Sequence, residues 1–207
     1  IYTGGEPLVR KDDLMRLCKK HSDCVFLCFT NATLIDEAFA DQMLEVGNFV
    51  PAISLEGFED ATDGRRGEGV YQKVIHAIEL LHRKKLIYGI SACYTSANFD
   101  SITSEEFYDK LIEMGVYFIW YFHYMPVGND AVPALMPTPK QREEIYHRIR
   151  KYRVENHYLR LIFKMMVNML VAVLLVADVI YILMQMVMLI HVSLFTIQIQ
   201  ILEKRLC

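Results

Sequence analysis

Runs of consecutive apolar residues alternate with amphipathic segments through most of this chain. The apolar runs, rich in Val, Ile, Phe, Tyr and Leu, cover residues 25–31, 49–57, 86–95 and 116–128. Charged and apolar residues at helical spacing predict helices at 12–21, 35–46, 71–85, 104–114 and 139–156. Strands that are apolar on both faces belong in a parallel sheet covered by helices. The pattern therefore predicts an α/β fold, with either an open doubly wound sheet or a barrel-like one.

Composition divides the chain into two parts. All 10 Gly and all 6 Pro precede residue 140, so the end of the chain has none of the usual turn residues. The formal net charge of −3 gives no sign of a nucleic-acid partner. The first residues, Ile-Tyr-Thr-Gly-Gly, do not have the pattern of a signal peptide, and we expect the chain to begin inside a strand. We predict a domain at residues 1–157 and an apolar tail at 158–207.

The five cysteines form an irregular set that predicts no disulfide framework and suits a reducing cytoplasm. Three of them, Cys18, Cys24 and Cys28, lie close in sequence. Cys18 is expected on a helix, while Cys24 and Cys28 belong to a strand-like run, so their thiolates would not converge on one cluster as ligands must. We predict that all three are small buried hydrophobic residues.

Polar residues stand where the apolar runs end, and in parallel α/β folds ligands meet the carboxyl ends of the strands. The first such segment is Thr3-Gly4-Gly5-Glu6-Pro7. Two glycines let a backbone approach a ligand closely, Glu6 can accept a hydrogen bond from a cationic group, and Pro7 stiffens the exit of the turn. A plain strand-to-helix turn explains the same residues equally well when they are taken alone.

Further polar residues follow the later runs in the same order. They are Thr30 and Asn31, then Ser54 and Glu56, then Arg65 and Arg66 in a loop expected at 63–67, then Ser91, and finally the segment 124–128. Together with Gly-Gly-Glu-Pro, this succession resembles the radical S-adenosylmethionine (radical SAM) enzymes over residues 1–157. The resemblance implies strands 2 to 6 of a partial (β/α)6 barrel. The first strand and the CxxxCxxC loop of that barrel, which holds a [4Fe–4S] cluster, are absent from the sequence.

The resemblance also implies which residues contact the cofactor, S-adenosylmethionine (SAM). These are Gly4, Gly5, Glu6, Pro7, Asn31, Ser54, Glu56, Arg66 and Ser91. Arg66 is preferred over Arg65 as the bidentate partner of the cofactor carboxylate. No catalytic residue and no metal ligand is expected within this chain.

The function implied is that of a radical SAM enzyme fragment. The parent enzyme would cleave SAM reductively through its [4Fe–4S] cluster to a 5′-deoxyadenosyl radical, and would modify a peptide or protein in the cytoplasm. The resemblance further implies an electron donor such as flavodoxin or ferredoxin. Because the cluster cysteines are missing, we expect the fragment alone to be inactive.

The apolar tail has the hydropathy of a membrane span, since residues Met165 to Leu202 contain one carboxylate, Asp178, and no Lys or Arg. Against a span, His191 and three Gln interrupt the run. Residues rich in Met, Leu, Ile and Val also arise when a gene is read out of register. Regrouped codons for 184–192 permit Ala-Asn-Gly-Asp-Val-Asp-Pro-Cys-Val, which resembles the cysteine-bearing turn of auxiliary-cluster (SPASM or twitch-like) domains. We therefore favour an out-of-frame remnant of an auxiliary iron–sulfur domain, beginning near His157.

Other interpretations remain open on these residues. The tail can be a transmembrane helix that anchors an α/β binding or scaffold domain, or an ordinary buried helix pair. The domain can also be a different (β/α) enzyme in which Gly-Gly-Glu-Pro is a coincidental turn and Glu6 or Glu56 is a general base.

Overall fold

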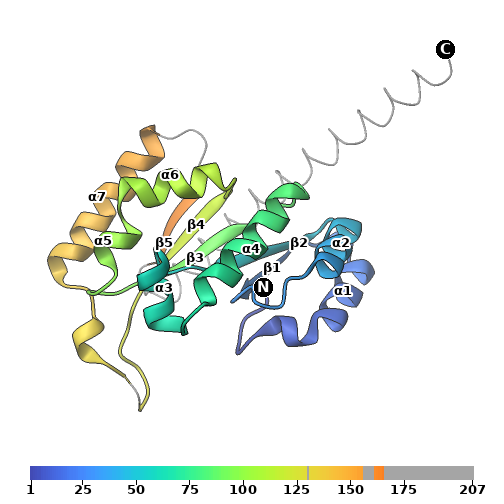
Figure 1. Ribbon diagram of the computed structural model, residues 1–207, viewed down its shortest axis with the longest axis horizontal. Helices are drawn as coiled ribbons and strands as arrows, with labels where there is room; N and C mark the ends of the chain where they lie inside the picture. Colours follow the sequence, from blue (N-terminus) through green and yellow to red (C-terminus); the bar gives the residue numbers. More distant parts are fainter. Residues whose placement is uncertain (130, 156–160, 166–207) are drawn as a thin grey trace.

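A computed structural model describes residues 1–129, 131–155 and 161–165 (Figure 1). Its five-stranded sheet has the order β1-β2-β3-β4-β5, and every neighbouring pair is parallel. The strands are β1 (Phe26–Thr30), β2 (Phe49–Ser54), β3 (Gly89–Tyr94), β4 (Phe118–His123) and β5 (Leu161–Met165). The helices are η1 (Pro7–Arg10), α1 (Lys11–Lys20), α2 (Glu37–Val46), α3 (Glu59–Arg66), α4 (Val70–Arg83), α5 (Phe99–Ile102), α6 (Glu105–Glu113), η2 (Pro133–Leu135) and α7 (Pro139–Glu155).

The predicted α/β fold with a parallel sheet is confirmed. The four strands expected from the apolar runs are all present, although each is shorter than its run. Tyr2 adds a bridge on the outer side of β1, where its N–H donates to the Leu27 carbonyl at 2.7 Å. The beginning of the chain therefore continues the sheet beside β1.

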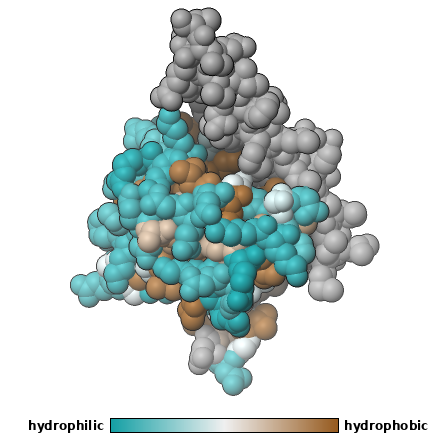
Figure 2. All heavy atoms as spheres, turned by 90° about the vertical axis from the view of Figure 1, so that its right-hand side faces the viewer, coloured by the Kyte–Doolittle hydropathy of each residue, from teal (hydrophilic) through white to brown (hydrophobic). Residues whose placement is uncertain are grey.

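Each face of the sheet carries its own apolar layer. The larger core lies between the strands and the helices, which Figure 1 shows crossing one side of the sheet, and it includes Phe39, Ile53 and Ile78. A smaller cluster, Leu27, Val50, Ala52, Phe118 and Trp120, occupies the opposite face. Burial of apolar area on both faces is the main stabilising contribution to such a sheet. On the outer surface shown in Figure 2, hydrophilic residues surround smaller apolar patches.

Packing in the smaller cluster requires glycine at position 89. A Cβ added at Gly89 would overlap the ring of Phe118, its register partner on β4. The absence of a side chain at this point lets the Phe118 ring lie directly over β3.

Two of the helices, α2 and α6, begin at a capping side chain. Asp36 is the N-cap of α2 and its carboxylate accepts a hydrogen bond from the Phe39 N–H at 2.7 Å. Gly47 ends the same helix in the left-handed conformation, with φ of 69°. Ser104 caps α6 in the same manner as Asp36, through the Phe107 N–H at 3.1 Å.

The prediction of a loop at residues 63–67 is wrong, because residues 63–66 form the second half of α3 and Gly67 follows its last residue. Acidic residues stand in the first turn of α3 and Arg65 and Arg66 in the last, which suits the helix dipole. Gly67, with φ of 105°, ends the helix, and the Asp63 carboxylate accepts the N–H groups of Gly69 and Tyr71, both at 2.7 Å, at the start of α4. The Gly, Asp and Arg residues of this segment led to the prediction of a loop. The segment is instead part of a short helix that the charged residues at its two ends stabilise.

β5 lies beyond the predicted domain boundary at residue 157 and pairs with β4 from Phe118↔Leu161 to Phe122↔Met165. The sheet therefore extends past that boundary. Within the described residues, no helix combines the length and the apolar character needed to cross a membrane. Of the predicted tail at 158–207, to which the membrane-span and out-of-frame interpretations apply, the structure describes residues 161–165, and the rest lies outside the described residues.

Candidate functional site

The described strands β1 to β4 all point the same way, so the residues that follow them share one edge of the sheet, here named the carboxyl edge. Thr30, Ser54, Tyr94 and His123 are the last residues of these strands. Tyr2 runs parallel to β1, so the turn after it reaches the same edge. The polar residues singled out in the sequence are therefore brought together, as expected for a parallel sheet.

Glu6 joins the first turn to the end of β1. Its Oε1 accepts hydrogen bonds from the Leu8 N–H at 3.0 Å and the Thr30 hydroxyl at 2.7 Å, and its Oε2 accepts the Asn31 N–H at 2.8 Å. Pro7 follows as the first residue of η1, which Glu6 caps. Since a carboxylate has about four acceptor positions, the half-buried Glu6 has room for one further donor.

Gly4 and Gly5 leave the backbone beside Glu6 open. Gly4 has φ of 126°, a conformation that side chains rarely adopt, and a Cβ added at either glycine would meet no atom within 4 Å. Close packing therefore requires glycine at neither position, and the open space permits a ligand to approach this backbone.

Glu56 is the centre of a charged cluster at the ends of β2 and β3. Its side chain is 0 % exposed, and its Oε1 accepts hydrogen bonds from Arg66 through Nε at 3.0 Å and through Nη2. Its Oε2 accepts the Cys93 N–H at 2.9 Å and lies 3.7 Å from Arg65 Nη1. A buried carboxylate needs such partners, because its desolvation is otherwise costly.

This cluster gives Glu56 and Arg66 a mutual contact that the resemblance did not imply. Glu56 is fully buried and both its oxygens are engaged, so it orients Arg66 and is not placed to take a proton from a ligand. Arg66 keeps 25 % of its side chain exposed. Arg65 is more exposed, donates to the Cys93 carbonyl at 3.3 Å and lies with its guanidinium 6.0 Å from the centre of the Tyr124 ring.

Ser54 and Ser91 are direct partners in the β2–β3 register, and Trp120 is the next partner on β4. Both serines are half-buried and, by alternation with Ala52, belong to the face of the smaller apolar cluster. Asn31 differs, because its side-chain oxygen accepts the Thr33 N–H at 3.0 Å and hydroxyl at 2.7 Å and so closes its own turn.

The cysteines divide by burial. Cys18, on α1, and Cys28, on β1, are buried in the core, and desolvation raises the pKa of the Cys18 thiol to about 11 and that of Cys28 to about 12. Cys24 is exposed, ahead of β1, so its expected place in the core is wrong. Among residues 1–129, 131–155 and 161–165, no three side chains of His, Cys, Asp or Glu are arranged to hold a metal ion.

Asn98 is a part of this edge that sequence reasoning missed. It is 7 % exposed, its Nδ2 donates to the carbonyl oxygens of Glu56 and Cys93, both at 3.1 Å, and its Oδ1 accepts the Thr95 N–H at 2.6 Å. The signal was the polar segment Thr-Ser-Ala-Asn after a strand, which is typical of turns closed by side chains. Asn98 thus holds the ends of β2 and β3 at a fixed spacing.

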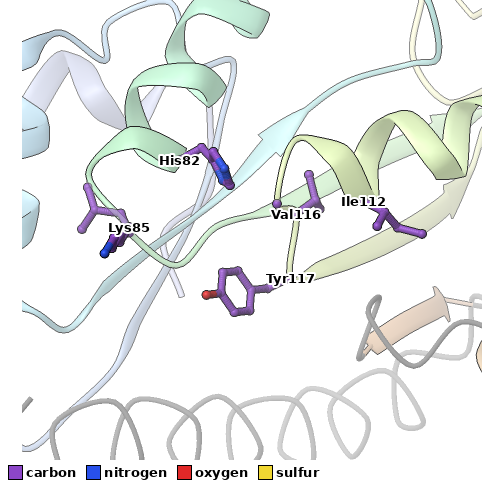
Figure 3. A pocket seen from close by; sticks show the side chains of 7 residues that line it. His82, Lys85, Ile112, Val116 and Tyr117 are labelled. Carbon is purple, nitrogen blue, oxygen red and sulfur yellow. The ribbon is translucent and has the colours of Figure 1, made fainter. Parts of the chain in front are cut away.

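Two cavities lie at opposite edges of the sheet. One of about 720 Å³ lies at the carboxyl edge, between α3, the segment from β3 to α5, and Leu135 of η2. The other, of about 320 Å³, lies at the amino edge (Figure 3), where His82 in the last turn of α4, Lys85 just after that helix and Val116 after α6 line it. A Cβ at Gly115 would overlap the His82 ring, so that second cavity is shaped by close packing of two helix ends.

Residues 1–99 match the model of the radical SAM superfamily. The chain is 26 % identical to the Fe-coproporphyrin III synthase of Methanosarcina barkeri over 134 residues, 63 % of this chain and 33 % of the relative. It is 32 % identical to the pre-heme d1 synthase of Dinoroseobacter shibae over 101 residues, 47 % of this chain and 25 % of the relative. The chain thus spans about a third or less of these relatives.

Solved structures share the fold. SuiB of Streptococcus suis aligns with a TM-score of 0.66 at 18 % identity, covering 79 % of this chain and 38 % of SuiB. SuiB has also been solved bound to S-adenosylmethionine and to its precursor peptide SuiA. The protein anSMEcpe, solved with bound AdoMet, aligns with a TM-score of 0.61 at 21 % identity, covering 77 % of this chain and 46 % of that one. Residues 1–99 thus match the radical SAM superfamily model, and the chain shares its fold with these solved structures.

Proposed function

We propose that this chain is the SAM-binding part of a radical SAM enzyme and that it binds SAM at the carboxyl edge. The observation that carries the proposal is the open backbone of Gly4 and Gly5 beside Glu6, whose carboxylate three hydrogen bonds hold in place. An ammonium group finds a preorganised acceptor there. Preorganised polar groups bind at little cost in conformational entropy.

The other residues expected to contact the cofactor divide into two groups in this proposal. Ser54, Ser91 and Arg66 contact it directly, because their side chains are partly exposed on this edge. Arg66 supplies a guanidinium whose orientation Glu56 fixes, and it takes the cofactor carboxylate. Glu56 and Asn31 are positioning residues, since their side-chain oxygens already accept hydrogen bonds within the chain.

When bound, SAM and a reduced [4Fe–4S] cluster supply the radical chemistry for which the superfamily is named. In this proposal the described residues contribute the orientation of the cofactor. A complete enzyme further requires an electron donor such as flavodoxin or ferredoxin.

For the substrate, a peptide or protein is our first candidate. It is supported by the fold likeness to SuiB, which has been solved with a precursor peptide, at a TM-score of 0.63. In this proposal the peptide approaches the carboxyl edge, where the cofactor lies.

A tetrapyrrole is the second candidate. The two curated relatives are named as synthases of Fe-coproporphyrin III and of pre-heme d1, and their identities of 26 % and 32 % exceed those of the solved structures. Hydrogen abstraction from a tetrapyrrole side chain would use the same cofactor site.

Equilibrium dialysis with labelled SAM tests the cofactor site on the full chain. We expect saturable binding, and we expect Gly5→Val to weaken it at least about tenfold, because a side chain would fill the space above the backbone. Lys20→Val, at an exposed position on α1, is the matched control and should bind as the wild type does. Equal binding by Gly5→Val, with unchanged circular dichroism, would refute this placement of SAM.

A further inference from the structure

The cavity of about 720 Å³ at the carboxyl edge has features that cofactor binding at Gly4 to Glu6 does not use. Its apolar lining comes from Phe58, Ala61, Ala97 and Leu135. Thr95 and Asn98 also line it, but they are bonded to each other and to the backbone, so they form its frame. Arg65 and Asp60 are the charged side chains that line it.

Arg65 is held in place by groups from three strand ends. The Cys93 carbonyl, near the end of β3, accepts from Nη1 at 3.3 Å, Glu56 after β2 lies at 3.7 Å, and the Tyr124 ring after β4 lies at 6.0 Å. Yet 37 % of the side chain is exposed. Because a guanidinium carries five N–H donors, an arginine held in this way has donors left for a ligand.

The charge balance of the cluster also favours an anion. Arg66 neutralises Glu56, which leaves the positive charge of Arg65 uncompensated within these three side chains. Asp60, in the first turn of α3, lies five residues away, or about 7.5 Å along the helix axis. A ligand carboxylate at Arg65 therefore need not contact Asp60.

Gly64 supplies an independent sign of a ligand. It lies inside α3, where glycine lowers helix stability, and a Cβ there would meet no atom within 4 Å. Neither packing nor a left-handed backbone requires glycine at this position. Since Gly64 lines the cavity next to Arg65, its missing side chain enlarges the space available to a ligand.

We propose that this cavity is a substrate subsite in which Arg65 binds a carboxylate of the substrate and Gly64 makes room for the atoms next to it. The subsite rests on the proposed function, because it orients a substrate beside the bound cofactor. The ligand chemistry is a carboxylate on an apolar body. Both a peptide, through Asp, Glu or its C-terminus, and a tetrapyrrole, through its propionates, carry that chemistry.

Binding of two probe pairs to the full chain, without SAM, tests the subsite. One pair is acetyl-Leu-Glu-amide and its Gln counterpart, measured by calorimetry. The other is coproporphyrin III and its tetramethyl ester, measured by porphyrin fluorescence. The carboxylate member of at least one pair should bind at least about tenfold more tightly than its neutral partner. The pair that shows the preference identifies the source of the carboxylate.

Two variants locate the effect. Arg65→Gln should abolish the preference while Glu56 keeps Arg66 as its partner, and Arg16→Gln, at an exposed site on α1, should retain it. Gly64→Ala should raise the Tm by about 2–4 °C, because alanine favours the helix, and should nevertheless weaken binding of the preferred probe. A wild type with no preference for either carboxylate, or an Arg65→Gln variant that keeps it, overturns the proposal.

SAM binding, measured in parallel, separates this inference from the proposed function. Arg65→Gln should bind SAM as the wild type does. If that variant loses SAM binding and keeps the carboxylate preference, Arg65 serves the cofactor and the subsite is wrong. If the wild type binds no SAM but shows the carboxylate preference, the cofactor proposal fails alone.

Discussion

The two edges of the sheet are held together by opposite kinds of side chain. At the carboxyl edge, carboxylates accept backbone N–H groups, as Glu6 does from Asn31 and Glu56 from Cys93. At the amino edge, the buried amide of Asn48 donates from Nδ2 to the carbonyl oxygens of Cys18, His21 and Cys24 at 3.1, 3.1 and 2.9 Å.

This difference follows from the direction of the chain. After each strand the chain enters a helix at the carboxyl edge, and helix N-termini present unpaired N–H groups and a positive partial charge. Helices end at the amino edge with unpaired carbonyl oxygens. The carboxyl edge therefore suits anionic side chains and anionic ligands. The amino edge instead requires hydrogen-bond donors for its carbonyl oxygens, and the neutral amide of Asn48 supplies them.

The largest effect is expected from Glu56→Gln. The substitution keeps the shape of the side chain but leaves two guanidinium groups without their carboxylate. We expect a loss of about 3 kcal/mol in the free energy of unfolding, at the low end for a buried pair because Arg66 and Arg65 are partly exposed. Urea unfolding of the full chain measures it. A loss no larger than that of an exposed pair such as Lys19 and Glu45 would show that the cluster does not hold this edge.

Asn48→Ala should have the next largest effect. It removes the donor shared by three carbonyl oxygens at the amino edge, and we expect a loss of about 2 kcal/mol in the same urea measurement. SAM binding should be unchanged, because this edge is remote from the cofactor site. A weaker affinity for SAM in a folded Asn48→Ala protein would contradict the separation of the two edges.

The smallest effect concerns Asp36, the exposed N-cap of α2 at the carboxyl edge. Its hydrogen bond with Lys11, followed by that from the Phe39 N–H, lowers the pKa of this carboxyl in the folded protein. A lowered folded pKa adds stability above the unfolded value of about 3.9 and loses it as pH falls through the folded pKa.

Asp36→Asn retains the cap without the charge, so the comparison isolates the charge. The wild type should be more stable by up to about 1 kcal/mol at pH 7, and the difference should be lost as the pH falls through the folded pKa of Asp36. Thermal unfolding across this range checks it. A difference that grows towards low pH would give the opposite sign for the pKa change.

The order of strands and helices was predictable, because apolar runs and helical spacing are local patterns. The meeting of Glu6, Ser54 and Ser91 at one edge followed from parallel strands alone. The pairing of Glu56 with Arg66 did not, since it depends on α3, whose helical character the Gly and Asp residues concealed. Asn98 was missed for a similar reason, because its hydrogen bond to the Glu56 carbonyl joins segments that are distant in sequence.

Hydrogen exchange of the full chain, with and without SAM, tests the central claim that the carboxyl edge is the cofactor site. SAM is expected to slow exchange of the amides of Gly4 to Glu6, of Leu55 after β2 and of Cys93 near the end of β3. No change is expected at Leu86 and Val116 of the amino-edge cavity. Protection confined to those amino-edge amides, or none at Gly4 to Glu6 at saturating SAM, would contradict it.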